Sequence, residues 1–599
     1  MCFPCAINSM PTQPHAWRTK LIAGLMVSLW LIVAGRLVHI QQFQNRELSA
    51  SAARQREIEV EVPARPADIV DRHGKLLAST IVMSSLFVDP TRLDVDTEFF
   101  IELAAALNLD TDLLVETIAN ARQRNRRFVW LKRRLSADEV DAVEQFEWPP
   151  GSHGFRDEFL RRYPQGHLAA HVLGLRDIDG RGRGGVEQSL DYLIVGQPGR
   201  RRLVRDAMGR IVEVSFDPES EPQRFDEVSL TIDLAVQMFA EQELDSIVEK
   251  WSPRSASVIV MDPRVGDILA MASRPTYSPD DPSDVPADAW KNQAISIVYE
   301  PGSTLKPFIV AWALEQGVIS RDEMFHCENG MYRMGRRELH DHHRYGKLSV
   351  TDILVKSSNI GMAKIGERLG NAELYRATIA FGFGNRTGID LPGELPGLLR
   401  PLDKWNSYST GSIPMGQELA VTPLQLMTAH AALANGGRLI TPRILSGVHG
   451  HRHDSESAFV ASTDEPRNSV PTTIVTPTVQ TDIAKWIVEV PMTEVVKRGT
   501  GTKAQLDSYA VFGKTGTAQK MDPNGGGYSD TLHTASFICG APAHDPRVLV
   551  LVVVDEPQSG RTHYGGVIAA PPARQILHRT LLHLGVSSDA EIRTADKRR

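Results

Sequence analysis

The chain has 599 residues, which is too long for one ordinary hydrophobic core and predicts several domains. Hydrophobic residues make up 42% and charged residues 23% of it, as expected of a mostly globular protein. Its net charge of −7 gives no basic surface for nucleic acid, so nucleic-acid binding is excluded from the expected functions.

The first expected element is an apolar segment near the start. Leu21–Gly35 carries no charge, but at ~1.5 Å per helical residue it spans only ~22 Å of a ~30 Å hydrocarbon layer. Continuing the helix to Ile40 completes the span, because the long side chain of Arg36 can reach the headgroups. We therefore predict a transmembrane helix over residues 18–40.

Basic residues indicate how this helix is oriented. Arg18 and Lys20 precede the apolar run, so residues 1–17 are expected to form a cytoplasmic tail. The rest of this single-pass protein then lies outside the cytoplasmic (inner) membrane, in the periplasm where one exists. A cleaved signal peptide is the alternative, and the lack of an A-x-A site after the run favours a retained anchor.

Residues 41–225 predict an irregular, β-rich domain. Ile58–Val62 alternates with period two like a strand, and Asp71–Gly74 predicts a turn before another strand. The glycine-rich string Gly182–Glu187 resembles a phosphate-binding loop, but it lacks the Gly-Lys-Ser/Thr ending and a preceding apolar strand. A turn is the preferred interpretation.

Residues 226–586 predict an α+β domain in which an antiparallel sheet is flanked by helices. The strand candidates are an early hairpin and two late apolar runs, Ser257–Met261, Asp267–Ala272, Thr534–Cys539 and Val548–Val554. Pro571–Leu584 predicts a late helix. Residues 449–475 predict a loop, and residues 587–599 predict a disordered tail.

Cysteines and histidines are two further residue types that could carry chemistry. Cys327 and Cys539 are expected to be buried free thiols, with a disulfide between them as the alternative. Two histidine groups lack the helical i, i+4 spacing of a metal site and are expected to be solvated loop residues: His340, His342, His343 and His449, His451, His453. We therefore expect no metal and no cofactor.

Ser303-Thr304-Leu305-Lys306 is the first of three short motifs that predict chemistry. Pro301-Gly302 breaks the chain, so Ser303 is expected to cap a helix that ends at Gly317. Ser303 and Lys306 then share one helix face at ~5–6 Å between Cβ atoms. A serine needs a nearby base, and a lysine is a base only when its pKa is lowered. Alone, the string also fits a plain cap and a surface lysine.

Ser357-Ser358-Asn359 is the second motif and is expected between two helices. The Ser357 hydroxyl can relay a proton between Lys306 and a leaving amine. The Asn359 amide can bind a peptide amide and also hold the lysine, because it offers both donors and an acceptor. An ordinary loop with an asparagine cap is the alternative.

Lys514-Thr515-Gly516-Thr517 is the third motif and follows a short apolar strand. Alternation along a strand puts Thr515 and Thr517 on one face, where their hydroxyls and the charge of Lys514 can bind a carboxylate. Gly516 is expected to leave room for a substrate backbone. The backbone N–H groups of Thr517 and Ser303 can together hold an oxyanion.

Each motif alone is weak, but S-x-x-K, S-x-N and K-T-G-T in this order are typical of enzymes that acylate a serine with a D-Ala-D-Ala peptide or a β-lactam. The chain resembles the class B penicillin-binding proteins, which are monofunctional peptidoglycan transpeptidases. The resemblance extends to Leu230–Asp233, Tyr299–Ser303, Lys356–Gly361, Val421–Gln425, Gly513–Gln519 and Tyr564–Gly566. It departs from the family at Pro66 and Ala67, where Arg-Gly is usual, and at Asp280 or Asp281, where Asn is usual.

The resemblance implies a non-catalytic pedestal domain over 41–225 and a penicillin-binding transpeptidase domain over 226–586. It implies Ser303 as nucleophile and Lys306 as base. Ser357 and Asn359 become relay and substrate ligands, and the 514–517 strand becomes the carboxylate-binding edge. Implied partners are stem peptides, lipid-linked nascent glycan, a membrane-embedded glycosyltransferase and divisome proteins, with β-lactams as inhibitors.

Length and the single anchor look most like the division-type (FtsI-like) branch, and an elongation-type enzyme is the alternative. Two other functions are less consistent with the sequence. A β-lactam hydrolase or sensor is disfavoured because no E-x-x-L-N string lies between Asn359 and Lys514. A non-enzymatic division scaffold is disfavoured because every catalytic side chain is present.

Overall fold

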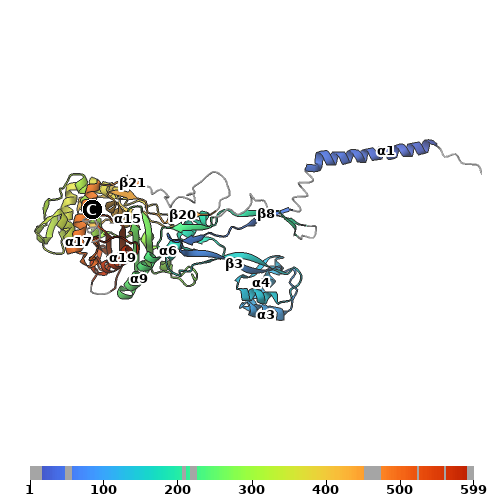
Figure 1. The fold of residues 1–599 in the computed structure, drawn as a ribbon, viewed down its shortest axis with the longest axis horizontal. Helices are drawn as coiled ribbons and strands as arrows, with labels where there is room; N and C mark the ends of the chain where they lie inside the picture. The colour runs from blue at the N-terminus through green and yellow to red at the C-terminus, as the bar shows by residue number, and fades with distance from the viewer. Residues whose placement is uncertain are drawn as a thin grey trace, which may run out of the picture. The chain divides into compact units, whose positions relative to one another are not determined.

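The computed structural model describes residues 16–46, 57–205, 211–215, 225–450, 474–522, 525–558 and 562–589. The chain (Figure 1) divides into two compact units. The first comprises Met1–Ala64 with Gln197–Gln223, and the second comprises Arg65–Gly196 with Arg224–Arg599. All three motifs belong to the second unit.

The first unit begins with the expected apolar helix. Helix α1 runs over Ala16–His39 and continues as the π-helical turn η1, Ile40–Gln44. Trp17–Gln44 is long and apolar enough to cross a membrane, with a mean hydropathy of 2.2 in its most apolar window, none of which is buried in protein. A helix over 18–40 is therefore confirmed, and it ends slightly later than expected.

The first unit also holds a three-stranded antiparallel sheet in the order β1-β8-β9, with strands Glu57–Val62, Gly199–Arg205 and Ile211–Ser215. The alternating segment predicted as a strand lies in β1. Glu61 stands opposite Arg200, whose guanidinium is 4.0 Å from Glu59. These pairs favour the register only modestly, because they are exposed.

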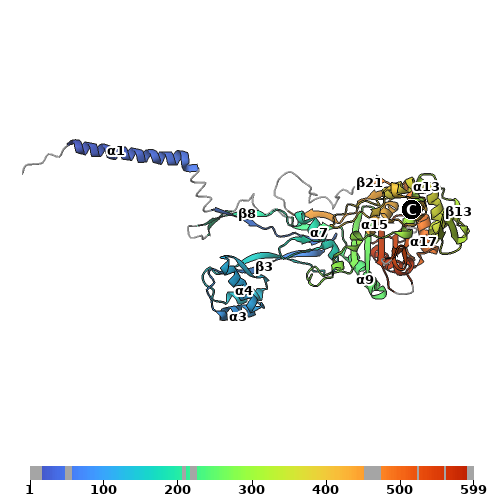
Figure 2. The same cartoon turned by 180° about the vertical axis from the view of Figure 1, so that it is seen from behind.

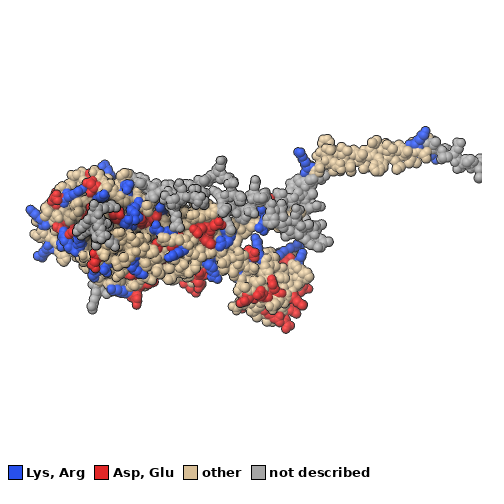
Figure 3. All heavy atoms as spheres, viewed as in Figure 1, with Lys and Arg blue, Asp and Glu red and all other residues tan. Residues whose placement is uncertain are grey.

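The second unit starts with a small lobe that contains helices the sequence analysis missed. Its elements are β3 (Leu76–Val88), α3 (Thr97–Ala106), α4 (Thr111–Gln123), β4 (Val129–Leu135), α5 (Ala137–Glu144) and β5 (His153–Arg162). Asp96, Asp110 and Ser136 cap the three helices by accepting backbone hydrogen bonds. Leu103 packs with Leu86 in the lobe's own core. Figure 3 shows Asp and Glu side chains gathered on its face.

A six-stranded sheet joins this lobe to the rest of the unit. Its order is β20-β10-β2-β3-β4, with β5 paired to β3, and its remaining strands are β2 (Asp68–Val70), β10 (Glu227–Leu230) and β20 (Leu445–His449). β10 runs parallel to β2 and antiparallel to β20. Segments on both sides of residue 225 therefore share one sheet and one hydrophobic core.

The glycine-rich string Gly182–Glu187, predicted as a turn, contains the short strand β7, a bend at Gly184 and the start of the short helix α7. Gly185 has a φ of +51°, and a Cβ there would lie 2.3 Å from a neighbouring backbone nitrogen. The carboxylate of Glu187 is fully buried, 2.6 Å from Arg161 Nε and 2.6 Å from Arg176 Nε. Close backbone packing explains the glycines of this string, and a buried ion network explains its glutamate.

The motifs are organised by a five-stranded antiparallel sheet in the order β12-β11-β24-β23-β22. Its strands are β11 (Ser255–Asp262), β12 (Asp267–Arg274), β22 (Phe512–Met521), β23 (Tyr528–Ala541) and β24 (Val548–Asp555). The predicted hairpin and late strands are confirmed. β22 is an edge strand, so one of its sides can receive another segment of backbone.

Helices cover both faces of this sheet. α9 (Leu234–Trp251) and α19 (Ala570–His583) pack together on one face (Figure 1). The other face carries the helices around the motifs, several of which Figure 2 shows close together. They are α11 (Lys306–Glu315), α12 (Val350–Lys356), α13 (Asn359–Ala380), α15 (Pro423–Ala434) and α16 (Thr481–Ile487). Helix α17 (Thr493–Arg498) packs against β22, and its Val496 belongs to the same hydrophobic cluster as residues of α9 and α19.

Shorter elements connect these layers. They include α6 (Ala170–Leu173), β6 (Leu175–Arg176), β7 (Gly182–Arg183), α7 (Gly185–Ser189), α8 (Asp191–Ile194), α10 (Gln293–Ser296), β13 (Met324–His326), β14 (Met331–Met334), β15 (Arg337–His340), β16 (Lys347–Ser349), β17 (Leu398–Leu399), α14 (Ser409–Ser412), β18 (Leu419–Ala420), β19 (Arg438–Ile440), β21 (Ile474–Pro477) and α18 (Gly565–Ile568). Residues 451–473 of the expected loop and 590–599 of the expected tail lie outside the described residues.

Two smaller expectations are corrected or settled. The carboxylate of Asp589 accepts a hydrogen bond from Ala510 N at 2.6 Å, so the fold extends beyond residue 586. Cys327 and Cys539 are buried free thiols, and the alternative disulfide between them is not formed.

Candidate active site

Ser303 lies in a tight turn that leads into a buried helix. Gly302–Leu305 forms the 3-10 turn η4, which continues into α11. The prediction that Ser303 is the helix cap is wrong, because Pro301 occupies the cap position and Ser303 is already inside the turn. The Ser303 side chain is half-buried and lines a cavity, and the helix ends before Gly317 as predicted.

Lys306 connects the first motif to the second. Its fully buried amine donates to Ser357 O at 2.7 Å, Ser357 Oγ at 3.2 Å and Asn359 Oδ1 at 2.9 Å. Burial lowers the pKa of Lys306 to about 7, and the negative charge of Asp341 opposes this shift. Near neutral pH a substantial share of this amine is therefore uncharged and able to accept a proton.

The Ser357 hydroxyl lies between two lysines. Ser357 follows the last residue of α12 with a left-handed φ of 57°, and Ser358 caps α13 by accepting from Gly361 N. This sharp reversal presents Ser357 Oγ to Lys306 Nζ at 3.2 Å and to Lys514 Nζ at 3.1 Å. All three motifs therefore meet at one hydroxyl oxygen.

Lys514 is the second buried amine. It is fully buried on β22, and its pKa is lowered first by desolvation and then by the positive charge of Lys306. Burial and mutual repulsion both disfavour a state in which the two amines are charged at once. A bound anion would raise the pKa of the lysine that it contacts, because it stabilises the charged form of that amine.

Thr515 and Thr517 line the cavity, as expected for alternate residues of a strand. Thr515 Oγ1 is 2.7 Å from Thr500 Oγ1, and Thr517 Oγ1 accepts from Gly565 N at 3.2 Å. These contacts fix both hydroxyls before any ligand binds. Thr500 was not identified from the sequence, because only the tertiary fold brings it to β22.

Gly516 lies where the edge strand β22 meets the Ser303 turn. A Cβ at residue 516 would lie 2.3 Å from Ser536 Oγ, 2.9 Å from Thr304 Cγ2 and 3.1 Å from Pro301 O. Glycine thus lets the strand approach the turn closely, a reason that differs from the expected room for a substrate backbone. The fully buried ring of His430 supports the same turn through a 3.2 Å contact between its Nε2 and Thr304 O.

A cavity of about 930 Å³ opens beside these groups. Of the predicted site residues, it is lined by Ser303, Ser357, Asn359, Thr515 and Thr517. The two buried lysines lie against this wall through their contacts with Ser357. This volume is typical of a ligand-binding pocket, for which about 300–1,000 Å³ is usual.

Four histidines line the mouth of this cavity, and two of them come from the group expected to be solvated. His342 and His343 are exposed, whereas the rings of His533 and His563 stack with centroids 4.0 Å apart. In the other group, His449 ends strand β20, and His451 and His453 lie outside the described residues. No short spacing in the sequence connects His342 with His533 and His563, so their proximity could not be predicted.

Asp341 is a site residue that the sequence analysis overlooked among these histidines. Its carboxylate accepts from Ser358 Oγ at 2.6 Å and from the backbone nitrogens of Asn359 and Ile360. Asn359 Nδ2 also donates to His340 O at 3.1 Å. The hairpin of β14 and β15 thereby fixes the start of α13 and the position of the Asn359 amide.

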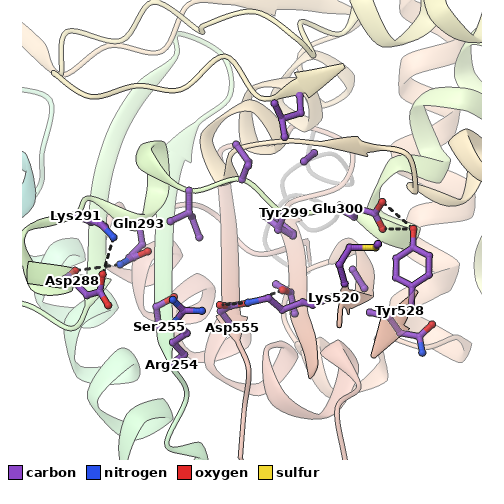
Figure 4. A pocket seen from close by; sticks show the side chains of 18 residues that line it. Arg254, Ser255, Asp288, Lys291, Gln293, Tyr299, Glu300, Lys520, Tyr528 and Asp555 are labelled. Carbon is purple, nitrogen blue, oxygen red and sulfur yellow. Dashed lines mark hydrogen bonds and ion pairs between the residues drawn. The ribbon is translucent and has the colours of Figure 1, made fainter. Parts of the chain in front are cut away.

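A second cavity of about 480 Å³ continues along the edge of β22, and Glu300, Ala518 and Gln519 line both cavities. In Figure 4 its charged side chains pair within the wall. Lys520 Nζ is 2.8 Å from Asp555 Oδ2, and Tyr528 donates to Glu300 at 3.0 Å. The second cavity therefore continues the cavity beside Ser303. Because its labelled charged side chains already have partners, it offers a ligand few unpaired charges.

Comparison with known proteins covers most of the chain. "Penicillin binding protein transpeptidase domain" matches residues 256–578, and "Penicillin-binding Protein dimerisation domain" matches 61–224. The chain is 34% identical to the probable peptidoglycan D,D-transpeptidase PenA of Neisseria gonorrhoeae, over 88% of this chain and 86% of PenA. It is 31% identical to the peptidoglycan D,D-transpeptidase FtsI of Escherichia coli (strain K12), over 97% of this chain and 94% of FtsI.

Solved structures give the same picture. Penicillin-binding protein 3 from Mycobacterium tuberculosis, complexed with aztreonam, aligns with a TM-score of 0.66 at 27% identity. The alignment covers 88% of this chain and 98% of that protein. The ampicillin complex of the same protein aligns with a TM-score of 0.65.

Asp341→Ala should loosen the second motif, because it removes three hydrogen bonds that end on one carboxylate. We expect the free energy of local opening across residues 356–361 to fall by about 2 kcal/mol. Hydrogen exchange of the detergent-solubilised full chain measures this. Glu338→Ala, in the exposed part of the same hairpin, is the matched control and should change it by less than about 0.5 kcal/mol. Equal effects of the two variants would contradict the role of Asp341.

Proposed function

The chain belongs to the penicillin-binding protein transpeptidases, and from that membership we propose that it cross-links peptidoglycan stem peptides through an acyl-enzyme on Ser303. The observation that carries this proposal is the buried amine of Lys306, with its lowered pKa, one helical turn from the Ser303 backbone. A serine beside such an amine has the base that a nucleophilic hydroxyl needs.

Acylation begins when Ser303 Oγ attacks the carbonyl carbon of the penultimate D-Ala. The hydroxyl proton passes to the neutral Lys306 amine, and the carbonyl oxygen becomes an oxyanion. Ser357 Oγ, in contact with Lys306 Nζ, relays a proton to the leaving D-Ala nitrogen as the peptide bond breaks. An amine of a neighbouring stem peptide then attacks the ester, forms the cross-link and restores the Ser303 hydroxyl.

The remaining predicted residues are assigned to binding. We assign the substrate's terminal carboxylate to the Thr515 and Thr517 hydroxyls, with Lys514 as the nearby charge. The backbone N–H groups of Ser303 and Thr517 are assigned to the oxyanion, where one lost donor typically costs ~2.7–4 kcal/mol of transition-state stabilisation. β-Lactams are expected to acylate Ser303 as substrate analogues. The Asn359 amide, held by His340 O, is assigned to the donor peptide.

Ser303→Ala should abolish covalent labelling by a fluorescent penicillin, because the proposed acyl-enzyme forms on the Ser303 hydroxyl. Labelling is read as fluorescence of the denatured chain on a gel. The matched control is Ser407→Ala, a substitution at an exposed serine, which should label like the wild type. Undiminished labelling of the folded Ser303→Ala chain would overturn the assignment of the nucleophile.

The acylation rate should rise with pH and level off above the pKa of Lys306, about 7. Burial favours the neutral amine, so the base is present above this pKa and is lost by protonation below it. The second-order rate with a penicillin should be about tenfold lower one pH unit below the pKa than on the plateau. His342→Gln/His343→Gln should keep this profile, and a flat profile from pH 5.5 to 8 would refute Lys306 as base.

We also assign the enzyme to septal wall synthesis, with its N-terminus in the cytoplasm and its catalytic unit outside the membrane. Arg18 and Lys20, in the first turns of α1 and before its apolar run, and the likeness to FtsI support this. As no glycosyltransferase domain is among the matched families, a membrane-embedded glycosyltransferase and divisome proteins are the proposed partners.

A fluorescent protein that matures only in the cytoplasm, fused to the N-terminus, should be bright and concentrate at midcell of a rod-shaped host. The same protein fused to the C-terminus is the control for orientation and should stay dark. An even signal along the sidewall would favour the elongation-type alternative, and a bright C-terminal fusion would refute the orientation.

A further inference from the structure

Three segments that are far apart in the sequence bring His73, Asp233 and His583 together. His73 lies in the turn between β2 and β3, Asp233 caps α9, and His583 is the last residue of α19. Their possible ligand atoms all lie within 4.8 Å of one another. None of the three lines the cavity beside Ser303.

The two imidazoles converge on one carboxylate oxygen. His73 Nε2 lies 3.1 Å from Asp233 Oδ2, and His583 Nε2 lies 3.0 Å from the same oxygen. The ring planes are at 89° to each other, so the nitrogens approach from different directions. Metal–ligand bonds of ~2.0–2.1 Å in a tetrahedron separate ligand atoms by about 3.3 Å. The two nitrogen–oxygen distances are slightly shorter than this, and the two imidazole nitrogens, which lie within 4.8 Å of each other, would move together on binding an ion.

The backbone holds this arrangement independently of the histidine contacts. Asp71 Oδ1 accepts from His73 N at 2.8 Å, and Asp71 Oδ2 accepts from Leu234 N at 3.1 Å. Asp233 Oδ1 accepts from the first backbone nitrogens of α9 and also lies 3.0 Å from His583 Nε2, whereas Oδ2 is the oxygen that both rings contact. The turn and the helix start are therefore already fixed relative to each other, as a preformed ligand set requires.

Burial and access also fit a cation site. The Asp233 side chain is 1% exposed, whereas those of His73 and His583 are 48% and 31% exposed. A buried carboxylate supplies the negative charge, and the open side leaves a position for water. Two imidazoles and one carboxylate are a donor set that Zn²⁺ accepts with a fourth, exchangeable ligand.

We propose that His73 Nε2, Asp233 Oδ2 and His583 Nε2 bind one divalent transition-metal cation of the zinc class. The ion would join the turn after β2, the start of α9 and the end of α19. The proposed role of the ion is structural. An ion that binds only the folded chain raises the free energy of unfolding by mass action. The sequence analysis expected no metal and did not consider these three residues as ligands.

The test uses the detergent-solubilised full chain, stripped with EDTA and dialysed against Zn²⁺ at low micromolar concentration. We expect about one equivalent of zinc per chain by plasma mass spectrometry, and a higher melting temperature than that of the stripped protein. His583→Gln and His73→Gln should each weaken zinc binding at least tenfold. Asp233 is left intact in this test, because its loss would also uncap α9.

Two matched controls locate the ion. His578→Gln, on the same helix, and His563→Gln, at the cavity mouth, should keep the full zinc content. Co²⁺ in place of zinc should give visible absorption bands that His583→Gln abolishes. The proposal is overturned if the stripped chain takes up no zinc, if only His563→Gln loses it, or if His73→Gln and His583→Gln bind zinc like the wild type.

Discussion

The site depends on the burial of two amines beside one hydroxyl. Lys306 and Lys514 are both fully buried, and both contact Ser357 Oγ. Burying two ammonium ions costs several kcal/mol for each charge, so the pair sheds charge and both pKa values fall. In the proposed mechanism the same desolvation makes Lys306 a base and makes Lys514 responsive to a substrate carboxylate.

This burial requires close contact between an edge strand and a turn. β22 reaches the turn of Ser303 because Gly516 has no side chain, and a Cβ at Gly416 would lie 2.0 Å from Gly302 O. The close approach that these glycines allow therefore contributes to the burial of the two lysines. Because β22 is an edge strand, it can present Thr515 and Thr517 to a ligand while its other side remains bonded to β23.

The sequence allowed the motifs and the strands of the central sheet to be predicted better than the packing around them. Strands of the central sheet and the three motifs are local patterns, and the structure brings the motifs to one hydroxyl as expected. The cap role of Ser303 was wrong, because contacts with residue 416 draw the chain into a tighter turn. Asp341 and Thr500 were missed because their partners are distant in sequence. The lobe helices α3 to α5 were missed because they are short and largely exposed.

The shared sheet also changes how the boundary near residue 225 is understood. Domain boundaries normally fall where few contacts cross, yet β2 pairs with β10 in register across this point. Arg161 reaches from β5 to the carboxylate of Glu187, which is buried in the same unit. The two matched family domains are thus separate ranges of the sequence, whereas in the structure residues 65–196 pack with the residues after 224 as one compact unit. A displacement of the lobe would therefore strain β10 and, through the following residues, the start of α9 that supports the central sheet.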